Sequence, residues 1–303
     1  MDPLLRFTAL SKRYPGVVAL DDLTFEVPRG SIGVVGANGA GKTTMFRIIL
    51  GLSRPSAGQV EVVGLRVADD PIHVRSRLGY MPEHDCLPLD QTASDVVSTF
   101  GELSGLPPRA ARQRASEMLD LVGLDEARFR PIGGFSTGMR QRTKLAQALV
   151  GDPELVLLDE PTAGLDPLGR EEMLALVSRL RGFGVSVLMA THLLDDVQQV
   201  CDHVIMLDGG RLVLAGENES LLERTGVVTV DVGAHGDELV TALSSIGLSA
   251  VASDGVVDVT VEGDHHLDAL RDLIAERGFP LYRLSTRLTS LDEVFLRRAG
   301  GGT

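Results

Sequence analysis

The sequence has few of the features that mark secreted, metal-binding or membrane-spanning chains. Its 303 residues include two cysteines, Cys86 and Cys201, which lie far apart and fit no spacing typical of a metal or redox site. The opening residues lack a positive leader with a long apolar run, and no segment approaches the length needed to span a bilayer. We therefore expect a cytoplasmic protein with two reduced, inert thiols.

Basic residues are outnumbered by acidic ones. The sequence has 29 Lys and Arg residues against 42 Asp and Glu residues, which gives a net charge of -13. This charge repels nucleic acid and anionic membrane surfaces at long range, so we expect no nucleic-acid partner and a locally positive environment for any nucleotide. The 44% content of hydrophobic residues can supply the cores of one large domain and one small domain.

Short apolar runs typical of buried parallel strands recur along the chain. They are SIGVVG at 31–36, ELVLLDE at 154–160 and VSVLMAT at 185–191, and each is followed by a turn or helix signal. This alternation predicts an α/β fold with a mostly parallel core sheet, whose strands carry functional residues at their carboxyl ends. Residues 4–30 alternate like antiparallel strands and predict a small N-terminal sheet beside the core sheet.

Two further segments have their own patterns. Residues from about 85 to 140 contain helical patterns such as PRAARQRASEMLDLVGL and no good strand, which predicts an inserted helical subdomain. After Glu217 the pattern predicts strand, helix, strand, helix, strand and a closing helix at LDEVFLRRA. We therefore place one large domain at 1–217 and a small C-terminal α/β domain at 218–303. For the pair His265-His266 beside Asp264, we favour a solvated loop between strand and helix over a metal site, because no further ligand spacing is present.

A glycine-rich loop follows the first apolar run. Residues 36–43, GANGAGKT, fit G-x-x-x-x-G-K-[ST] between a predicted strand and a predicted helix, which is the context that a phosphate-binding loop requires. Its backbone N–H groups would wrap phosphates, Lys42 would reach the β and γ oxygens, and the Thr43 hydroxyl would bind Mg²⁺. The predicted nucleotide contacts are Gly36, Asn38, Gly39, Ala40, Gly41, Lys42, Thr43 and Thr44.

Two adjacent carboxylates, Asp159 and Glu160, end the second apolar run. They would repel each other unless a cation lay nearby, and Mg²⁺ is the cation that a phosphate site supplies. We expect Asp159 to hold Mg²⁺ through water and Glu160 to act as the catalytic base toward the water that attacks the γ-phosphate. The alternative, a solvated acidic turn, gives Lys42 no partner.

The stretch FSTGM at 135–139 opens another predicted helix. Ser136, Thr137 and Gly138 leave backbone N–H groups free at a helix start, where the helix dipole favours an anion. A helix cap made by Ser136 is an alternative that is compatible with this site. His192, at the end of the third apolar run, joins the residues at strand ends, which favours a contact with the γ-phosphate over a structural hydrogen bond.

Together these motifs resemble the ATP-binding subunit of an ABC transporter over roughly residues 4–217. GANGAGKTT is similar to the phosphate loop of that family, FSTGM to its signature, LVLLDE to its acidic strand, AGLD with Asp166 to its dimer-contact loop, and His192 to its switch histidine. The resemblance implies head-to-tail pairs, in which Ser136, Thr137, Gly138 and Met139 close over the nucleotide of the partner. It also implies that Tyr14, in SKRYPG, stacks on adenine, with plain packing as the alternative.

Two positions depart from the family pattern. Glu83, in LGYMPEHD, stands where Gln is usual, and Thr137 stands where the first signature Gly is usual. A carboxylate at Glu83 can bind Mg²⁺ or orient water, although it brings negative charge toward the γ-phosphate; an exposed loop acid is the alternative. Thr137 needs a backbone conformation that a β-branched residue can adopt.

The resemblance implies an ATP-driven motor that uses Mg²⁺ and acts with two partners, a separate transmembrane permease subunit and a second ATP-binding subunit, which we expect to be identical. GYMPE, STGM and LDEVFL look most like single-cassette subunits of drug, antibiotic and lipid exporters. We expect the chain at the inner face of the cell membrane, held there by its partner. The competing interpretation is a soluble ABC-type ATPase acting on nucleic acid or ribosomes, but such proteins carry a long coiled coil or a second cassette. A phosphate-loop kinase would leave FSTGM and AGLD unexplained.

Overall fold

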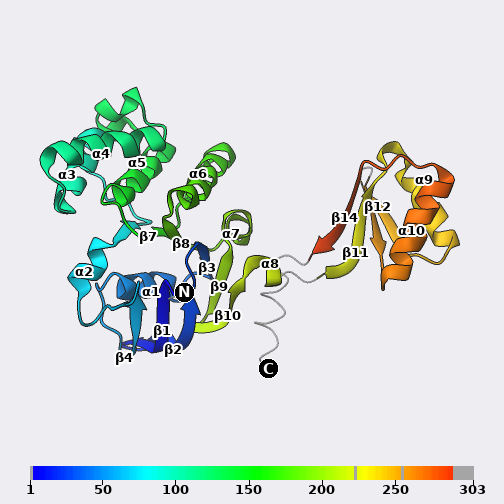
Figure 1. Ribbon diagram of the computed structural model, residues 1–303, viewed down its shortest axis with the longest axis horizontal. Helices are drawn as coiled ribbons and strands as arrows, with labels where there is room; N and C mark the ends of the chain where they lie inside the picture. The colour runs from blue at the N-terminus through cyan, green and yellow to red at the C-terminus, as the bar shows by residue number, and fades with distance from the viewer. Residues whose placement is uncertain (1–2, 222–223, 254–255, 289–303) are drawn as a thin grey trace. The chain divides into compact units, whose positions relative to one another are not determined.

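The computed structural model describes residues 3–221, 224–253 and 256–288, and the chain divides into two compact units between Glu219 and Ser220 (Figure 1). The closing helix expected at LDEVFLRRA lies outside the described residues. Within these residues, no helix combines the length and the apolar character that a membrane crossing requires.

The core of the first unit is a six-stranded sheet in the order β10-β9-β3-β8-β7-β6. All neighbours in it pair in parallel except β9 and β10, which confirms the predicted mostly parallel sheet. Its strands are β3 (Ser31–Val35), β6 (Leu78–Met81), β7 (Leu155–Asp159), β8 (Ser186–Thr191), β9 (His203–Asp208) and β10 (Arg211–Glu217). Every residue of β3, β7 and β8 is buried, as expected for strands covered on both faces.

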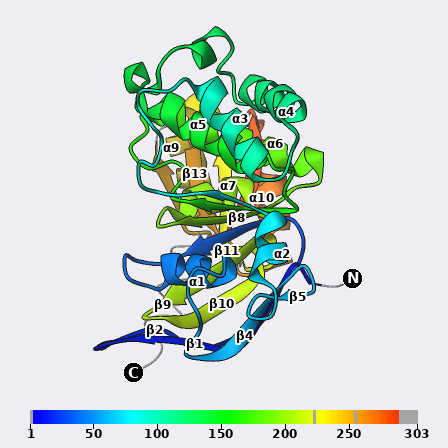
Figure 2. The same cartoon turned by 90° about the vertical axis from the view of Figure 1, so that its left-hand side faces the viewer.

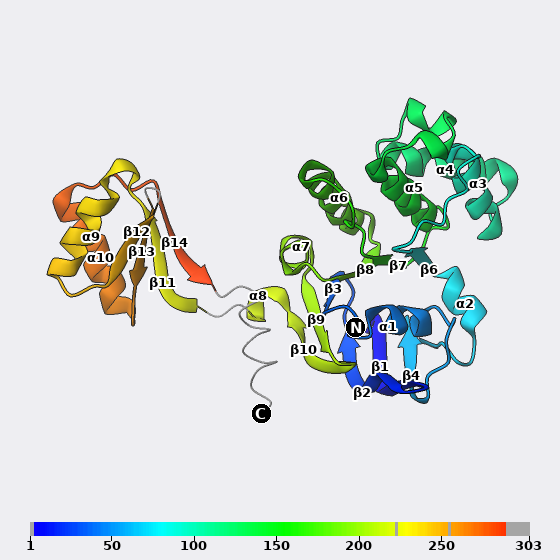
Figure 3. The same ribbon diagram turned by 180° about the vertical axis from the view of Figure 1, so that it is seen from behind.

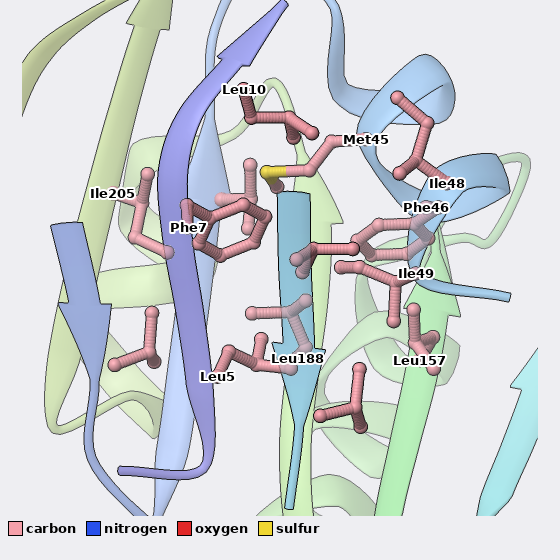
Figure 4. Packing of buried hydrophobic residues seen from close by; sticks show 14 of the residues in the cluster. Leu5, Phe7, Leu10, Met45, Phe46, Ile48, Ile49, Leu157, Leu188 and Ile205 are labelled. Atoms are coloured by element: carbon pink, nitrogen blue, oxygen red, sulfur yellow. The ribbon is translucent and has the colours of Figure 1, made fainter. Parts of the chain in front are cut away.

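A smaller antiparallel sheet, in the order β2-β1-β4-β5, lies beside the core sheet. It consists of β1 (Leu5–Tyr14), β2 (Val17–Val27), β4 (Ala57–Val62) and β5 (Leu65–Arg66). Helix α1 (Lys42–Ile49) packs against it, and Figure 4 shows Phe7 and Leu10 of β1 near Met45 and Phe46 of α1. Because α1 is anchored by these buried side chains, its first residues are held in place at the end of β3.

Helices form the part of the first unit between β6 and β7, and Figure 2 shows α3, α4 and α5 gathered together. They are α3 (Ala93–Leu103), α4 (Pro108–Leu121) and α5 (Thr137–Leu149), with short 3₁₀ turns at Glu126–Phe129 and Ile132–Gly134. The Thr92 side chain caps α3, and Pro108 occupies the first turn of α4, where its missing N–H costs no hydrogen bond. Three further helices of this unit are α2 (Pro71–Ser76), α6 (Pro167–Leu180) and α7 (Leu194–Val200).

The second unit is an antiparallel sheet in the order β12-β13-β11-β14 with two helices, α9 and α10, on one face (Figure 3). After the short helix α8 (Asn218–Leu221), its elements are β11 (Arg224–Asp231), α9 (Gly236–Ser245), β12 (Ala250–Ser253), β13 (Val256–Thr260), α10 (Asp264–Arg277) and β14 (Arg283–Leu288). This βαββαβ order is that of ferredoxin-like units. The sequence pattern predicted the helices and three strands but missed β12, whose four residues are half-buried or exposed.

Candidate functional site

The loop between β3 and α1 has the close backbone approach that its glycines allow. A Cβ atom on Gly36 would lie 2.4 Å from the carbonyl oxygen of Leu207. Gly41 is the N-cap of α1 with φ of 105°, and a Cβ atom there would lie 2.5 Å from the carbonyl oxygen of Ala19. These two positions need glycine, and the N–H groups of the first turn of α1 are therefore presented to an anion.

Lys42 is the first residue of α1, and its side chain is buried over the loop. Its Nζ atom donates to the carbonyl oxygen of Gly36 at 2.5 Å and to that of Ala37 at 3.4 Å. The same atom lies 3.8 Å from Oε1 of Glu160. One ammonium group thus joins the glycine loop to the acidic strand end and offers a positive charge to a phosphate in a region that is otherwise acidic.

A cleft of about 440 Å³ gathers most of the predicted nucleotide residues. It is lined by Tyr14, Val17, Ala19, Ala37, Asn38, Gly39, Ala40, Gly41, Lys42, Thr43, Thr44, Glu83, Asp159, Glu160, Ala163 and His192. Gly36 is absent from this lining and contributes through its carbonyl contact with Lys42. The size is typical of a small-ligand site. Residues separated by up to 178 positions in the sequence therefore meet in one place.

Asp159 is buried at the end of β7, and its charge is disfavoured. Burial first, and then the nearby charges of Glu83 and Glu160, raises the pKa of Asp159 to about 6, while Lys42 and a hydrogen bond from Tyr80 act in the opposite direction. The carboxylate is therefore poised to gain from a cation placed beside it.

Glu160 has an unusual backbone as well as a buried side chain. Its φ angle is 49°, in the left-handed region that non-glycine residues rarely adopt, and its N–H donates to the carbonyl oxygen of Ala190 at 2.9 Å. Its Oε2 atom lies 3.0 Å from Nδ1 of His192, whose ring is half exposed. The pair of side chains is thus aimed into the cleft from the ends of β7 and β8.

Tyr80 was not identified from the sequence, although it touches the predicted metal residue. It lies in β6, which pairs in parallel with β7, and its hydroxyl donates to Asp159. Burial and the neighbouring Asp159 charge raise the pKa of Tyr80 to about 12, so it stays a donor. The stretch LGYMPE was interpreted for Glu83 and for the resemblance to exporter subunits but not for Tyr80. The parallel pairing of β6 with β7 could not be inferred from either strand alone.

Tyr14 lies at the end of β1 and lines the cleft with a 39% exposed side chain. The Nζ atom of Lys12 lies 4.8 Å from the centre of its ring. A hydrogen bond with Ser53 lowers the pKa of the Tyr14 hydroxyl. An exposed ring at the rim of the cleft fits the stacking role expected for it.

We expect Tyr14→Ala to weaken ATP binding by about 5- to 150-fold, because base–aromatic stacking contributes roughly 1–3 kcal/mol. Turnover at saturating ATP should change little, since the residue does not reach the acidic pair. Titration with a fluorescent ATP analogue measures the affinity, and Tyr14→Phe, which keeps the ring, is the control. Unchanged affinity in Tyr14→Ala would make this a packing residue.

The FSTGM residues line a second hollow, of about 410 Å³, that shares no lining residue with the cleft. Its lining comprises Ser136, Thr137, Gly138, Met139, Arg142, Gly164, Leu165, Asp166, Leu168, Gly169, Glu172 and Met173. Ser136 caps α5 by accepting from the N–H of Met139 at 3.3 Å, so the proposed structural alternative is present. Thr137 is the first helical residue of α5, a conformation that a β-branched residue can adopt at a small cost in helix propensity.

Asp166 also has a local structural contact. Its Oδ1 atom accepts from the N–H of Gly169 at 2.9 Å and caps α6. A buried cluster that the sequence did not reveal lies nearby, where Asp196 accepts from Thr162 Oγ1 at 2.7 Å and from Arg170 Nε at 2.5 Å. This cluster ties the segment after Glu160 to α6 and α7.

The two adjacent histidines lie in the first turn of α10, not in the loop expected for them. Their ring centres are 4.1 Å apart, and His266 accepts from the N–H of Glu262 at 3.1 Å. Within residues 3–221, 224–253 and 256–288, no three His, Cys, Asp or Glu side chains are grouped as a metal site would require. A cation in the cleft would therefore also need oxygen from Thr43 and from a bound phosphate.

The sequence and the fold of this chain are similar to those of known proteins. The ABC transporter family matches residues 20–163. The chain is 36% identical to the daunorubicin resistance ATP-binding protein DrrA3 of Streptomyces coeruleorubidus, over 99% of this chain and 96% of that protein. It is 33% identical to the Nod factor export ATP-binding protein I of Ralstonia nicotianae, over 98% and 94%. The solved structure of cbiO1 from Clostridium perfringens, part of the ABC transporter complex cbiONQ, has 27% identity and a TM-score of 0.66, covering 73% of this chain and 91% of that chain.

Proposed function

We propose that this chain is the ATP-hydrolysing motor of an exporter. The proposal starts from the family, because the chain belongs to the ATP-binding subunits of ABC transporters. The expected family and phosphate-loop ATPase fold are confirmed, and the chain is an ATPase of this family. The observation that carries the proposal is the cleft in which the glycine loop, Lys42, the acidic pair and His192 meet.

In this proposal the chain's own residues bind and orient ATP. The N–H groups at the start of α1 and the Lys42 ammonium hold the β- and γ-phosphates, and the Tyr14 ring covers the adenine. Glu160 takes a proton from the attacking water, and the His192 ring, 3.0 Å from Glu160, fixes the direction of that carboxylate and contacts the γ-phosphate.

The residues of the cleft also fit a magnesium ion. Thr43, Asp159 and Glu83 offer hydroxyl and carboxylate oxygens, which are the donors that Mg²⁺ prefers. The raised pKa of Asp159 marks a buried charge that a cation would relieve. When bound, Mg²⁺ neutralises charge on the β- and γ-phosphate oxygens.

The separation of the two hollows supports action as a pair. FSTGM lines a hollow that shares no lining residue with the cleft, which supports a role toward the nucleotide of another chain. We infer that a second, identical subunit supplies Ser136, Thr137, Gly138 and Met139 to the γ-phosphate, with Asp166 at the contact between subunits. ATP binding would close this dimer and hydrolysis would open it.

The movement would be passed to a separate transmembrane permease subunit. The names of the relatives, a daunorubicin resistance protein and a Nod factor export protein, favour export. The chain would then lie in the cytoplasm at the inner face of the cell membrane through that permease, without a nucleic-acid partner.

Two measurements test this function. Purified chain should release phosphate from ATP in the presence of Mg²⁺ and lose this activity in EDTA. A tagged chain extracted with detergent should retain a multi-span membrane protein, identified by mass spectrometry. Recovery with ribosomes or DNA, and with no membrane chain, would contradict the transporter role while leaving the ATPase activity intact.

We expect Glu83→Gln to hydrolyse ATP with Mg²⁺ at a rate within about tenfold of the wild-type rate, because either side chain offers an oxygen to the metal or water. Glu83→Ala, which removes that oxygen, is the matched comparison and should lower turnover further. Phosphate release against Mg²⁺ concentration measures both. If Glu83→Gln were fully inactive, the carboxylate would have a chemical role of its own.

A further inference from the structure

A buried lysine outside the cleft joins its acidic corner to the FSTGM helix. The sequence has three lysines, Lys12, Lys42 and Lys144. Lys144 is in α5 and is 2% exposed. Its Nζ atom donates to the carbonyl oxygen of Pro82 at 2.8 Å and to that of Glu83 at 3.0 Å.

The two carbonyl acceptors are needed at this place, because burial of an ammonium group lowers stability unless acceptors surround it. Burial lowers the pKa of Lys144, and the groups that face it and oppose this shift are Cys86, Asp85, Glu83 and Asp159. The two backbone acceptors compensate the burial, and they follow β6 directly. A methionine of similar length would fill the space and could not hold either carbonyl.

The contact of Lys144 with Pro82 and Glu83 connects an element of the second hollow to an element of the cleft. Helix α5 begins after Ser136 in the second hollow, and Lys144 follows eight residues later, about 12 Å along the axis. The carbonyls that Lys144 holds belong to the corner that presents Glu83 to the cleft. A rigid helix and one side chain therefore span the distance from FSTGM to the acidic side of the cleft.

We propose that Lys144 is a positioning residue that fixes the Pro82–Glu83 corner to α5, so that a phosphate bound in the cleft and the FSTGM end of α5 move together. This inference rests on the proposed function, since it requires ATP in the cleft. It assigns to Lys144 no contact with ATP itself. Without the ammonium group, the Pro82–Glu83 corner should move, so that the Glu83 carboxylate is no longer held at its place in the cleft. The phosphate loop should stay intact.

The first test is a cycle of variants in the full chain. Lys144→Met should lower kcat by about 10- to 100-fold, the scale of a small misplacement in a catalytic site, while ATP affinity changes less than about threefold. In a Glu83→Ala background the same change should have little further effect, because the group that Lys144 positions is already missing. Fully multiplicative losses in the double variant would overturn the proposal and indicate a general packing role.

Two controls separate positioning from folding. Arg128→Met removes another mostly buried cation that donates to a carbonyl, that of Ser116 at 3.0 Å, in the same helical part and away from the cleft. It should match Lys144→Met in any loss of thermal stability but not in kcat. Lys144→Arg, which keeps the charge and the donors, should restore part of the turnover lost in Lys144→Met.

A second measurement needs no change at Lys144. The Glu160→Gln chain, labelled with ¹³C at lysine Cε, should give three assignable signals during titration with Mg²⁺ and ATP. We expect the signals of Lys42 and Lys144 both to shift. A shift of Lys42 alone would overturn the role of Lys144 and leave the proposed function standing, whereas no shift at Lys42 would contradict the nucleotide site itself.

Discussion

Glu160→Gln should lower ATP hydrolysis by about 10²–10⁴-fold, the usual cost of removing a positioned general base, and leave ATP binding intact. The amide keeps the size of the side chain but cannot accept the proton of the attacking water. The phosphate loop and Lys42 are unaltered, so nucleotide remains bound. Phosphate release measures the loss, and Glu171→Gln on the exposed surface of α6 is the control that should retain full activity.

The persistent nucleotide should also change the oligomeric state. If FSTGM of one chain closes over the γ-phosphate of another, Glu160→Gln should form a dimer that depends on ATP and is visible by light scattering. Adding Ser136→Arg should prevent that dimer, because the larger side chain would block the N–H groups at the start of α5, while each chain still binds ATP.

The control for this result is Ser136→Ala in the same background. It removes the cap of α5, at a cost of about 1 kcal/mol in helix stability, without adding bulk. The N–H groups at the start of α5 stay free in Ser136→Ala, so the dimer should survive, weakened only by loss of the hydroxyl contact. A dimer that also survived Ser136→Arg would mean that Ser136 is a helix cap and contributes nothing to a second phosphate site.

Asp159→Asn should have opposite effects on activity and on stability. Hydrolysis should fall by at least about 10²-fold, because the neutral amide is a poor ligand for Mg²⁺. The nucleotide-free chain should become more stable at pH 7, on the order of 1–2 kcal/mol, because the unfavourable buried charge is gone.

The sign of the pH dependence follows from the raised pKa. Asp159 ionises above its ordinary value of 3.8 in the unfolded chain but only above about 6 in the folded chain. Its contribution to stability is therefore fully present below pH 3.8 and is lost as the pH rises to about 6. The advantage of Asp159→Asn at pH 7 should vanish as the pH approaches 4.

Thermal unfolding of the first unit at several pH values measures this difference, at low concentration because the isoelectric point is near 5. Exposed Asp195→Asn is the control and should show no such trend. With ATP and Mg²⁺ the order should reverse, since bound ligand stabilises the unchanged chain more. An Asp159→Asn chain that was less stable than the unchanged chain at pH 7 would contradict the buried-charge argument.

Local patterns predicted the parts of the cleft that are continuous in the sequence. The phosphate loop depends on its own glycines and on the strand and helix beside it, so GANGAGKT carried enough information. Buried strands such as 155–159 were identified because every residue in them is apolar up to Asp159. The family resemblance supplied Tyr14, Glu83 and Asp166, which no local pattern marks.

The missed residues are those whose partners are distant in the chain. Tyr80 meets Asp159 through a strand pairing, Lys144 meets Pro82 across 62 positions, and Asp196 meets Thr162 across 34. A buried Lys or Asp has no periodic signature, because its burial depends on acceptors supplied by other elements. Strand β12 was missed for the related reason that a short edge strand with exposed residues resembles a loop.

The left-handed backbone at Glu160 lowers the stability of the folded chain at the residue that we propose as the catalytic base. A non-glycine residue with φ of 49° costs on the order of 1 kcal/mol, and the folded chain carries that cost to aim one carboxylate. Glycine would remove this backbone cost, but it would also remove the carboxylate that lies 3.8 Å from Lys42 and 3.0 Å from His192. A screen for heat resistance that accepts changes at Glu160 should therefore also measure phosphate release, because we expect this carboxylate to be the catalytic base.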